Sequence, residues 1–116
     1  MYRLYISKHE MKSIGFKYDY ILKDYVYEFP VYKYGRKPII TCKLCVDTEN
    51  YEVWYGVYSQ GNMYAAYYDR EFHKSNLVVE TVENNIKKEF KRLGVTEERE
   101  WWYVKLFDEI QRRLSS

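Results

Sequence analysis

The chain has 116 residues, which is enough for one domain with its own hydrophobic core. Its net charge of +2 is close to balance, which argues against a dedicated binder of duplex DNA or RNA and against a strongly acidic DNA mimic. No apolar run is long enough to cross a membrane, and the two cysteines do not suggest a disulfide framework. We therefore expect a single cytoplasmic domain over residues 1–116, with no membrane partner.

The N-terminal residues predict a short strand and then a short helix. Residues 2–6 alternate in the way that an additional N-terminal strand requires. Ser7 and Glu10 have the spacing of a capping box, and Gly15 suits the left-handed backbone position that ends a helix. The helix is therefore expected over residues 7–15.

Residues 25–69 predict the main element, an antiparallel meander of four strands rich in tyrosine. The strands are expected at residues 25–34, 39–47, 52–58 and 63–69. The segments between them are short and carry turn residues, as β-hairpins require. The expected cross-strand partners are Tyr34 with Ile39, Asp47 with Glu52, and Tyr58 with Met63.

This pairing decides which side chains share a face, because successive residues of a strand point to opposite sides. The first face collects a mostly apolar set: Tyr27, Phe29, Val31, Ile40, Cys42, Leu44, Val46, Val53, Tyr55, Val57, Tyr64, Ala66 and Tyr68. The second face mixes charged and apolar side chains: Glu28, Lys43, Asp47, Glu52 and Asp69 with Tyr32, Cys45, Trp54, Tyr58, Met63, Ala65 and Tyr67. Since both faces hold rings, we expect a helix, a second copy or a partner to cover the second face.

Two helices are expected after the sheet. Residues 76–93 place apolar side chains at intervals of three and four, and Gly94 follows the last of them. Residues 97–114 follow Thr96, a good N-cap, and carry a stripe rich in aromatic residues. The predicted fold is thus α+β: a four-stranded antiparallel meander with a possible extra N-terminal strand, a short N-terminal helix and two C-terminal helices. The first two helices are expected on one face of the sheet and the third on the other.

The sequence lacks the patterns that usually mark an active site. Cys42 and Cys45 form a CxxC, but residues three apart in a strand point to opposite faces and cannot bind one metal ion together. The two histidines, His9 and His73, are expected in the first turn of a helix and in a polar loop. Neither a GxSxG nor a HExxH pattern occurs. We therefore expect a non-catalytic protein that holds no metal and no cofactor.

The aromatic second face is the candidate binding surface. Its candidate residues are Tyr32, Lys43, Trp54, Tyr58, Met63 and Tyr67. The first hypothesis is that this face binds a protein partner or a second copy of the chain. Single-stranded nucleic acid is the alternative, because rings beside cations such as Lys33, Arg36 and Lys37 hold single strands without sequence readout. A third interpretation is that the helix over residues 97–114 buries these rings as an ordinary second core layer.

Three runs of residues carry a resemblance to known proteins. They are GFKYD at residues 15–19, YEFPVYKY at residues 27–34 and GNMYAAYY at residues 61–68. They resemble small uncharacterised proteins encoded by prophages and other mobile elements of low-GC Gram-positive bacteria. The resemblance covers residues from about 11 to 95 and leaves out the last expected helix. It implies an accessory role in a phage or mobile element and assigns no functional residue.

Overall fold

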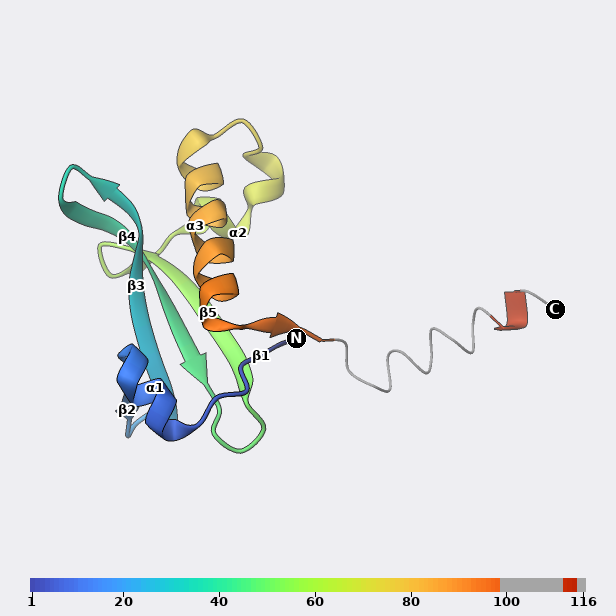
Figure 1. Ribbon diagram of the computed structural model, residues 1–116. Helices are drawn as coiled ribbons and strands as arrows, with labels where there is room; N and C mark the ends of the chain where they lie inside the picture. Colours follow the sequence, from blue (N-terminus) through green and yellow to red (C-terminus); the bar gives the residue numbers. More distant parts are fainter. Residues whose placement is uncertain (99–111, 115–116) are drawn as a thin grey trace.

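The computed structural model describes residues 1–98 and 112–114, and in this part an antiparallel sheet carries helices on one face (Figure 1). The α+β class is confirmed, but the sheet has seven strands in the described part and is larger than the expected four-stranded meander. The strands are β1 Tyr2–Arg3, β2 Lys17–Asp19, β3 Asp24–Tyr34, β4 Lys37–Val46, β5 Glu52–Ser59, β6 Asn62–Met63 and β7 Thr96–Glu97. The helices are α1 Lys8–Ile14, α2 Ala65–Tyr68, the 3-10 turn η1 Arg70–Phe72 and α3 Leu77–Leu93. The strand order is β2-β3-β4-β5-β1-β7, and β6 pairs with β5 off this path.

Helix α1 forms where the sequence places a helix. The Ser7 side chain accepts a hydrogen bond from the backbone N–H of Glu10 at 3.1 Å, as an N-cap should. The helix ends at Gly15, whose φ of 122° lies in the region that favours glycine. Met11 is buried on the inner side of the helix and joins the core. Local capping signals therefore determine both ends of α1.

Strands β3 and β4 form the long hairpin at the left of Figure 1. Tyr34 pairs with Lys37 and not with Ile39, because Gly35 at a φ of 62° allows a turn of only two residues. The expected register of this hairpin is therefore wrong by two positions. A shift of two leaves each residue on its expected face, since side chains alternate with a period of two. The face assignments hold until the register shifts near Tyr32.

Strand β5 pairs with β4 in the register that the sequence predicts. The expected fourth strand is wrong beyond Met63. Only Asn62 and Met63 pair with β5, and residues 65–68 form the helix α2. Tyr64 and Tyr67 lie three residues apart, so one helical turn brings both rings to the core, which an extended strand would not do.

The core lies between the sheet and the helices α1 and α3, as expected for the first two helices. Tyr25 of β3 is buried without having been assigned to a face, and the other buried side chains of β3–β5 were all expected on the first face: Phe29, Val31, Ile40, Cys42, Leu44, Val46, Val53 and Val57. Helix α3 contributes the stripe that its periodicity predicts: Val79, Val82, Ile86, Phe90 and Leu93. The side chain of Asn76 caps the start of α3, and Gly94 ends it. Removal of this apolar surface from water is the main favourable term for the fold.

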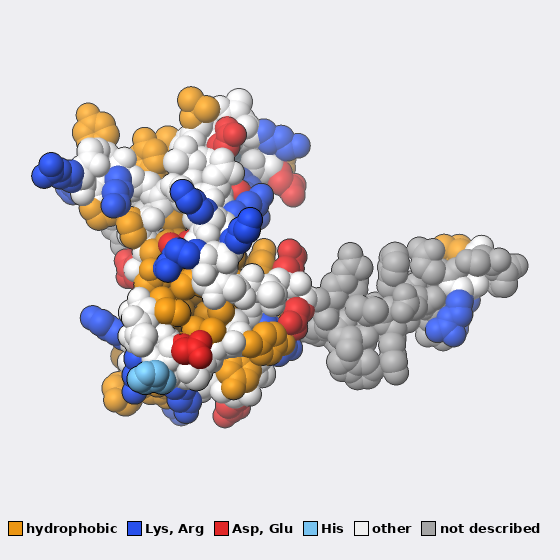
Figure 2. Space-filling model, viewed as in Figure 1, with side chains coloured by type: hydrophobic (Ala, Val, Ile, Leu, Met, Phe, Trp, Pro, Cys, Tyr) orange, Lys and Arg blue, Asp and Glu red, His pale blue; other side chains and the backbone are white. Residues whose placement is uncertain are grey.

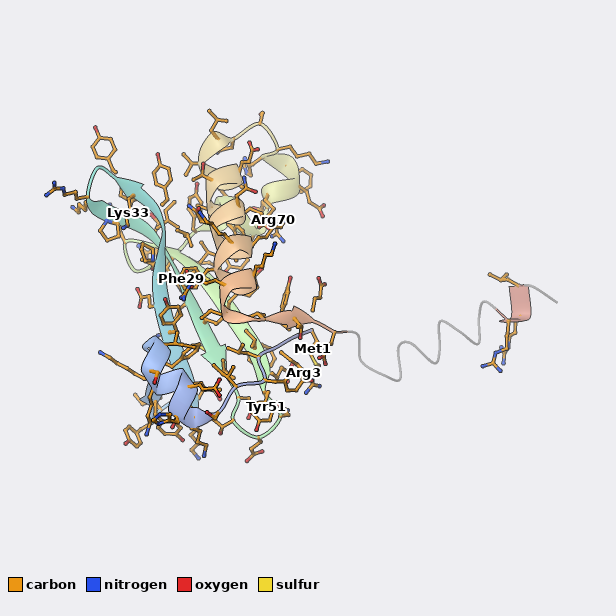
Figure 3. All side chains as sticks on the ribbon, viewed as in Figure 1. Met1, Arg3, Phe29, Lys33, Tyr51 and Arg70 are labelled. Carbon is orange, nitrogen blue, oxygen red and sulfur yellow. The ribbon has the colours of Figure 1, made fainter. Side chains whose placement is uncertain are left out.

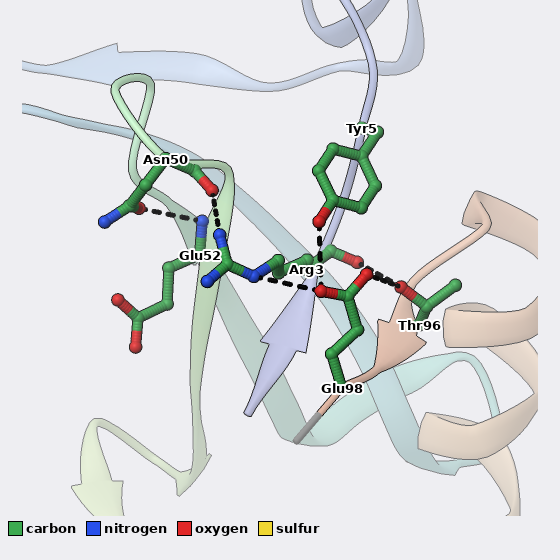
Figure 4. Close-up of polar contacts among 6 residues, drawn as sticks. All are labelled: Arg3, Tyr5, Asn50, Glu52, Thr96 and Glu98. Atoms are coloured by element: carbon green, nitrogen blue, oxygen red, sulfur yellow. Dashed lines mark hydrogen bonds and ion pairs between the residues drawn. The ribbon is translucent and has the colours of Figure 1, made fainter. Parts of the chain in front are cut away.

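A polar network closes the edge of the sheet at β1 (Figure 4). Arg3 lies at its centre, with its Nε 3.1 Å from the Glu98 carboxylate and its Nη1 donating to the carbonyl of Asn50 at 2.6 Å. The Tyr5 hydroxyl also donates to Glu98, at 3.0 Å. These contacts tie β1 to the β4–β5 turn and to the end of β7. Because the groups are partly exposed, we expect each pair to add about 1 kcal/mol or less to stability.

The helix expected over residues 97–114 lies largely outside the described residues, and so does its expected packing on the second face. Its expected start is wrong, because Thr96 and Glu97 form β7. These two residues pair with Arg3 and Tyr2, so the free edge of β1 takes them up as a strand. In the described part, no helix is long and apolar enough to cross a membrane.

Candidate functional site

The candidate site is the sheet face that points away from α1 and α3, which we call the outer face. The register places its side chains in rows across three strands. From one end to the other, these rows are Val26, Cys45 and Trp54, then Glu28, Lys43 and Gly56, then Pro30, Thr41, Tyr58 and Met63. Trp54 and Met63 keep 61% and 64% of their surface exposed, so nothing in the described part covers them.

Tyr58 lies flat along β5, over Gly56. A Cβ atom added to Gly56 would stand 2.6 Å from the Tyr58 hydroxyl and 2.8 Å from its ring, closer than real Cβ contacts. The missing side chain of Gly56 therefore provides the space that the ring occupies. This arrangement puts aromatic surface between the rows of Met63 and Trp54. The centre of the outer face thus presents a nearly continuous apolar strip.

One end of the outer face is acidic. Asp24, Asp47 and Glu52 lie next to one another there, and Asp19 of β2 pairs with Asp24. Burial raises the pKa of Asp24, and the charges of Asp47 and Asp19 raise it further. The effect of the Asp47 and Asp19 charges on the pKa of Asp24 indicates that these carboxylates lie close to that of Asp24. They form an anionic rim beside the row of Trp54.

Four of the six predicted binding residues lie together on the outer face. They are Lys43, Trp54, Tyr58 and Met63. Tyr67 does not join them, because it is only 1% exposed and belongs to α2. Its expected place on the second face is wrong, since the chain leaves the strand after Met63.

Tyr32 is also separated from the outer face. The β3–β4 register shifts on both sides of it, and its partner Ile40 is buried in the core. The irregularity resets the alternation, so Tyr32 packs at the edge of the core. Its expected place on the second face is therefore wrong. A bulge of this kind leaves no clear pattern in the sequence.

Tyr67 has a structural environment of its own. Burial raises its pKa, and hydrogen bonds to Tyr55 and Glu83 raise it further, so the phenol stays neutral. Its hydroxyl lies 3.0 Å from that of Tyr55. Arg70, labelled in Figure 3, lies over the Tyr67 ring at 4.5 Å, and its Nε is 3.3 Å from the Glu83 carboxylate. The cluster joins α2 and η1 to α3.

The two cysteines lie on opposite sides of β4, as the sequence predicts. Cys42 is buried in the core, and Cys45 is half-buried on the outer face. Burial raises the pKa of Cys42 to about 12 and also raises the pKa of Cys45. Both thiols are therefore protonated at neutral pH and are poor nucleophiles. Within the described ranges, no group of His, Cys, Asp and Glu could hold a metal ion.

Sequence reasoning missed one exposed apolar loop. Tyr20, Ile21 and Leu22 keep 84%, 92% and 51% of their surface exposed. The Asp19 carboxylate holds the loop by accepting the N–H groups of Leu22 and Ile21, each at 2.9 Å, and these bonds lower its pKa. The Asp19 carbonyl also accepts the N–H of Lys23 at 2.7 Å. The sequence signal for this turn was an aspartate, Asp19, placed a few residues before the predicted strand.

These features define a small α+β protein with helices on one face of an antiparallel sheet and exposed rings on the other. No family model, curated protein or solved structure matches the chain. A function must therefore be argued from the surfaces of the chain itself.

Proposed function

We propose that the protein is a non-catalytic binding protein whose outer face associates with another protein. The exposure of Trp54 and Met63 on an apolar strip is the observation that carries this proposal. Trp and Met belong to the residue types that are enriched in the buried centres of protein interfaces. Trp54, with 61% of its surface exposed, would lose most of that surface under a flat partner. An exposed strip of this kind is a common sign of an interaction site.

A second copy of the chain is the partner that the charges favour. The acidic end of the outer face lies at the start of β3, and the opposite end of the same strand leads into the hairpin turn with Arg36 and Lys37. When two such sheets stack face to face with antiparallel strands, the acidic end of each copy lies near the basic end of the other. Parallel stacking would bring like charges together. The antiparallel arrangement is therefore electrostatically self-complementary.

This arrangement also agrees with the usual anatomy of an interface. The two apolar strips meet at the centre, and the charged ends form a solvated rim. A twofold axis makes the same patch serve both partners, as in most protein dimers. Packed sheets keep their strand directions within about 30° of each other, which lets long strips remain in contact.

Sedimentation equilibrium over a wide range of protein concentrations tests the proposal. We expect a monomer–dimer equilibrium that Trp54→Ala weakens by about 30-fold for each site, the factor that a hot spot of about 2 kcal/mol implies. Phe72→Ala is the matched control, because Phe72 is 86% exposed on η1 and lies outside the outer face. A wild-type chain that remains monomeric throughout would refute the proposal. Equal weakening by the two variants would also refute it.

The genetic context and the cellular location of the protein are separate proposals. The sequence resemblance implies an accessory role in a prophage or mobile element. We also propose a cytoplasmic location. The free thiols of Cys42 and Cys45 support it, because a reducing compartment keeps thiols in this state. Oxidation-sensitive labelling of the two cysteines in cells would test this location.

A further inference from the structure

A groove runs between β3 and α3, on the side of the sheet opposite the outer face. Its strand wall is Phe29–Lys33, and its helix wall is Asn85, Lys88, Glu89 and Arg92. Figure 3 shows Phe29 and Lys33 on β3 beside α3. The groove has a volume of about 440 Å³, which is within the range of ligand sites. It is therefore large enough to hold part of an extended chain.

The groove has a basic rim. The cations that line it are Lys33, Lys88 and Arg92. Figure 2 shows Lys and Arg side chains gathered at the hairpin end and along α3. Glu89 is the one acid among the lining residues, and the Nε of Arg92 already donates to it at 2.6 Å. The surplus of positive charge favours a polyanionic ligand.

The free edge of β3 is closed to strand addition. Within the described residues, β2 pairs with β3 only as far as Val26, so the rest of this edge has no strand beside it. Pro30 has no N–H group, the Val31 carbonyl accepts the Asn85 side-chain amide at 2.8 Å, and the register shifts at Tyr32. Such features protect an edge against pairing with a peptide. A ligand of this groove must therefore be held by side chains.

Two tyrosines supply ring surface beside these cations. Tyr32 is half-buried in the groove wall, and Tyr34 is 77% exposed at the end of β3. Neither ring packs against another aromatic ring in the part of the chain that the structure describes. Tyr32 lines the groove and Tyr34 follows its last lining strand residue, Lys33. Rings beside cations are the combination that holds single-stranded nucleic acid through stacking and charge.

We propose that this groove binds a single strand of nucleic acid. Its phosphates lie along the rim of Lys and Arg side chains, and its bases stack on Tyr32 and Tyr34. A duplex is a poorer ligand, because its bases are already stacked on one another and none is free for the tyrosine rings. The proposal does not depend on self-association, since the groove and the outer face lie on opposite sides of the sheet.

The number of cations determines how steeply affinity falls with salt. If all three neutralise phosphates, the slope of log affinity against log salt is about −2.1, because each contact to a single strand contributes about −0.7. Raising the salt from about 50 to 200 mM would then weaken binding by about 20-fold. The loss of one cation should reduce the slope by about 0.7.

Fluorescence anisotropy with a labelled oligothymidylate tests the proposal on the full chain. Lys33→Glu and Lys88→Glu should each weaken binding by about tenfold or more and flatten the salt slope. Lys12→Glu is the matched control, since Lys12 is exposed on α1 and lies outside the groove. Tyr34→Leu should weaken binding by about fivefold or more without changing the salt slope. Far-UV circular dichroism of each variant checks that the fold is intact.

Three results would overturn the proposal. The first is a wild-type chain that does not bind the oligonucleotide at low salt. The second is a loss of affinity in Lys12→Glu equal to that in Lys88→Glu, because this would show binding by overall charge. The third is displacement of the oligonucleotide by polyglutamate as readily as by unlabelled oligothymidylate, which would assign the groove to acidic peptides.

Discussion

Truncation to alanine should cost far more stability at Tyr67 than at Trp54. The sequence assigns both rings to the same face, whereas the structure places Tyr67 in the core and Trp54 on the surface. The contrast in stability between Trp54→Ala and Tyr67→Ala therefore tests the description of the sheet directly. It also separates an effect on binding from an effect on folding.

The expected loss for Tyr67→Ala follows from its burial. Tyr67 is 1% exposed and is among the largest fully buried side chains. Truncation of a buried aromatic ring to alanine typically lowers the free energy of unfolding by about 3–5 kcal/mol. The variant also leaves the Tyr55 hydroxyl without its partner at 3.0 Å, which adds about 1 kcal/mol. This is a large part of the stability of about 5–15 kcal/mol that is usual for a domain.

The expected loss for Trp54→Ala is much smaller. Most of the Trp54 surface is already in contact with water, so little burial is lost on truncation. Substitutions at such surface positions usually change the free energy of unfolding by about 0.5 kcal/mol, and the scale of strand propensity spans only about 1 kcal/mol. The variant should remain folded under the conditions of the sedimentation experiment.

Urea unfolding followed by far-UV circular dichroism measures this contrast, since that signal comes mainly from the backbone. With an m-value of about 2 kcal/mol/M, Tyr67→Ala should lower the midpoint by about 2–3 M, and Trp54→Ala by about 0.5 M or less. The m-values themselves should stay close to the wild-type value. A loss above about 2 kcal/mol for Trp54→Ala would show that its ring is covered in the native state, and the outer face would then be part of a core.

Three further predictions concern single positions. The lowered pKa of Asp19 means that its carboxylate stabilises the 19–23 loop at neutral pH, and this contribution is lost as the pH falls through that lowered value. NMR shifts of the loop amides should follow this titration. Asp19→Ala should reproduce at pH 7 the spectrum that the wild-type chain shows in acid. Gly56→Ala should displace the Tyr58 ring and weaken self-association while the protein stays folded, which sedimentation and circular dichroism can check. A thiol reagent at neutral pH should modify Cys45 slowly and Cys42 only on unfolding, because Cys42 is buried and its pKa is about 12; mass spectrometry would refute this if Cys42 reacted first.

The parts of the fold that could be predicted from sequence are those with local signals. Ser7 and Gly15 mark the ends of α1, and the spacing from Val79 to Leu93 predicts the buried stripe of α3. The inner face of β3–β5 was also predictable, because an alternation of two is visible in any strand of eight or more residues. An error of two positions in the register does not disturb that pattern.

The remaining parts depend on contacts that are distant in the sequence. The alternation of Tyr64, Ala66 and Tyr68 is typical of a strand, and the contact of Tyr67 with Tyr55 decides in favour of a helical turn. Strands of two or three residues, such as β2 and β7, are too short to show any period, whereas the alternation of residues 2–6 predicted a strand of which Tyr2 and Arg3 form β1. Contacts that are distant in the sequence also explain why two predicted residues are missing from the candidate site. A helix redirects Tyr67 and a bulge redirects Tyr32.

The two proposed surfaces share only strand β3 and lie on opposite sides of the sheet, and this makes their effects separable. Along β3, Glu28 points to the outer face and Phe29 to the side of the groove.

A dimer formed through the outer faces would display two grooves on opposite sides of the pair. One oligonucleotide that is too short to reach both grooves should bind Trp54→Ala and the wild-type chain equally well. A strand long enough to reach both should bind the wild-type dimer more tightly, because the second contact becomes intramolecular. Equal affinity for long strands would therefore show that the two surfaces act independently or that the dimer does not form.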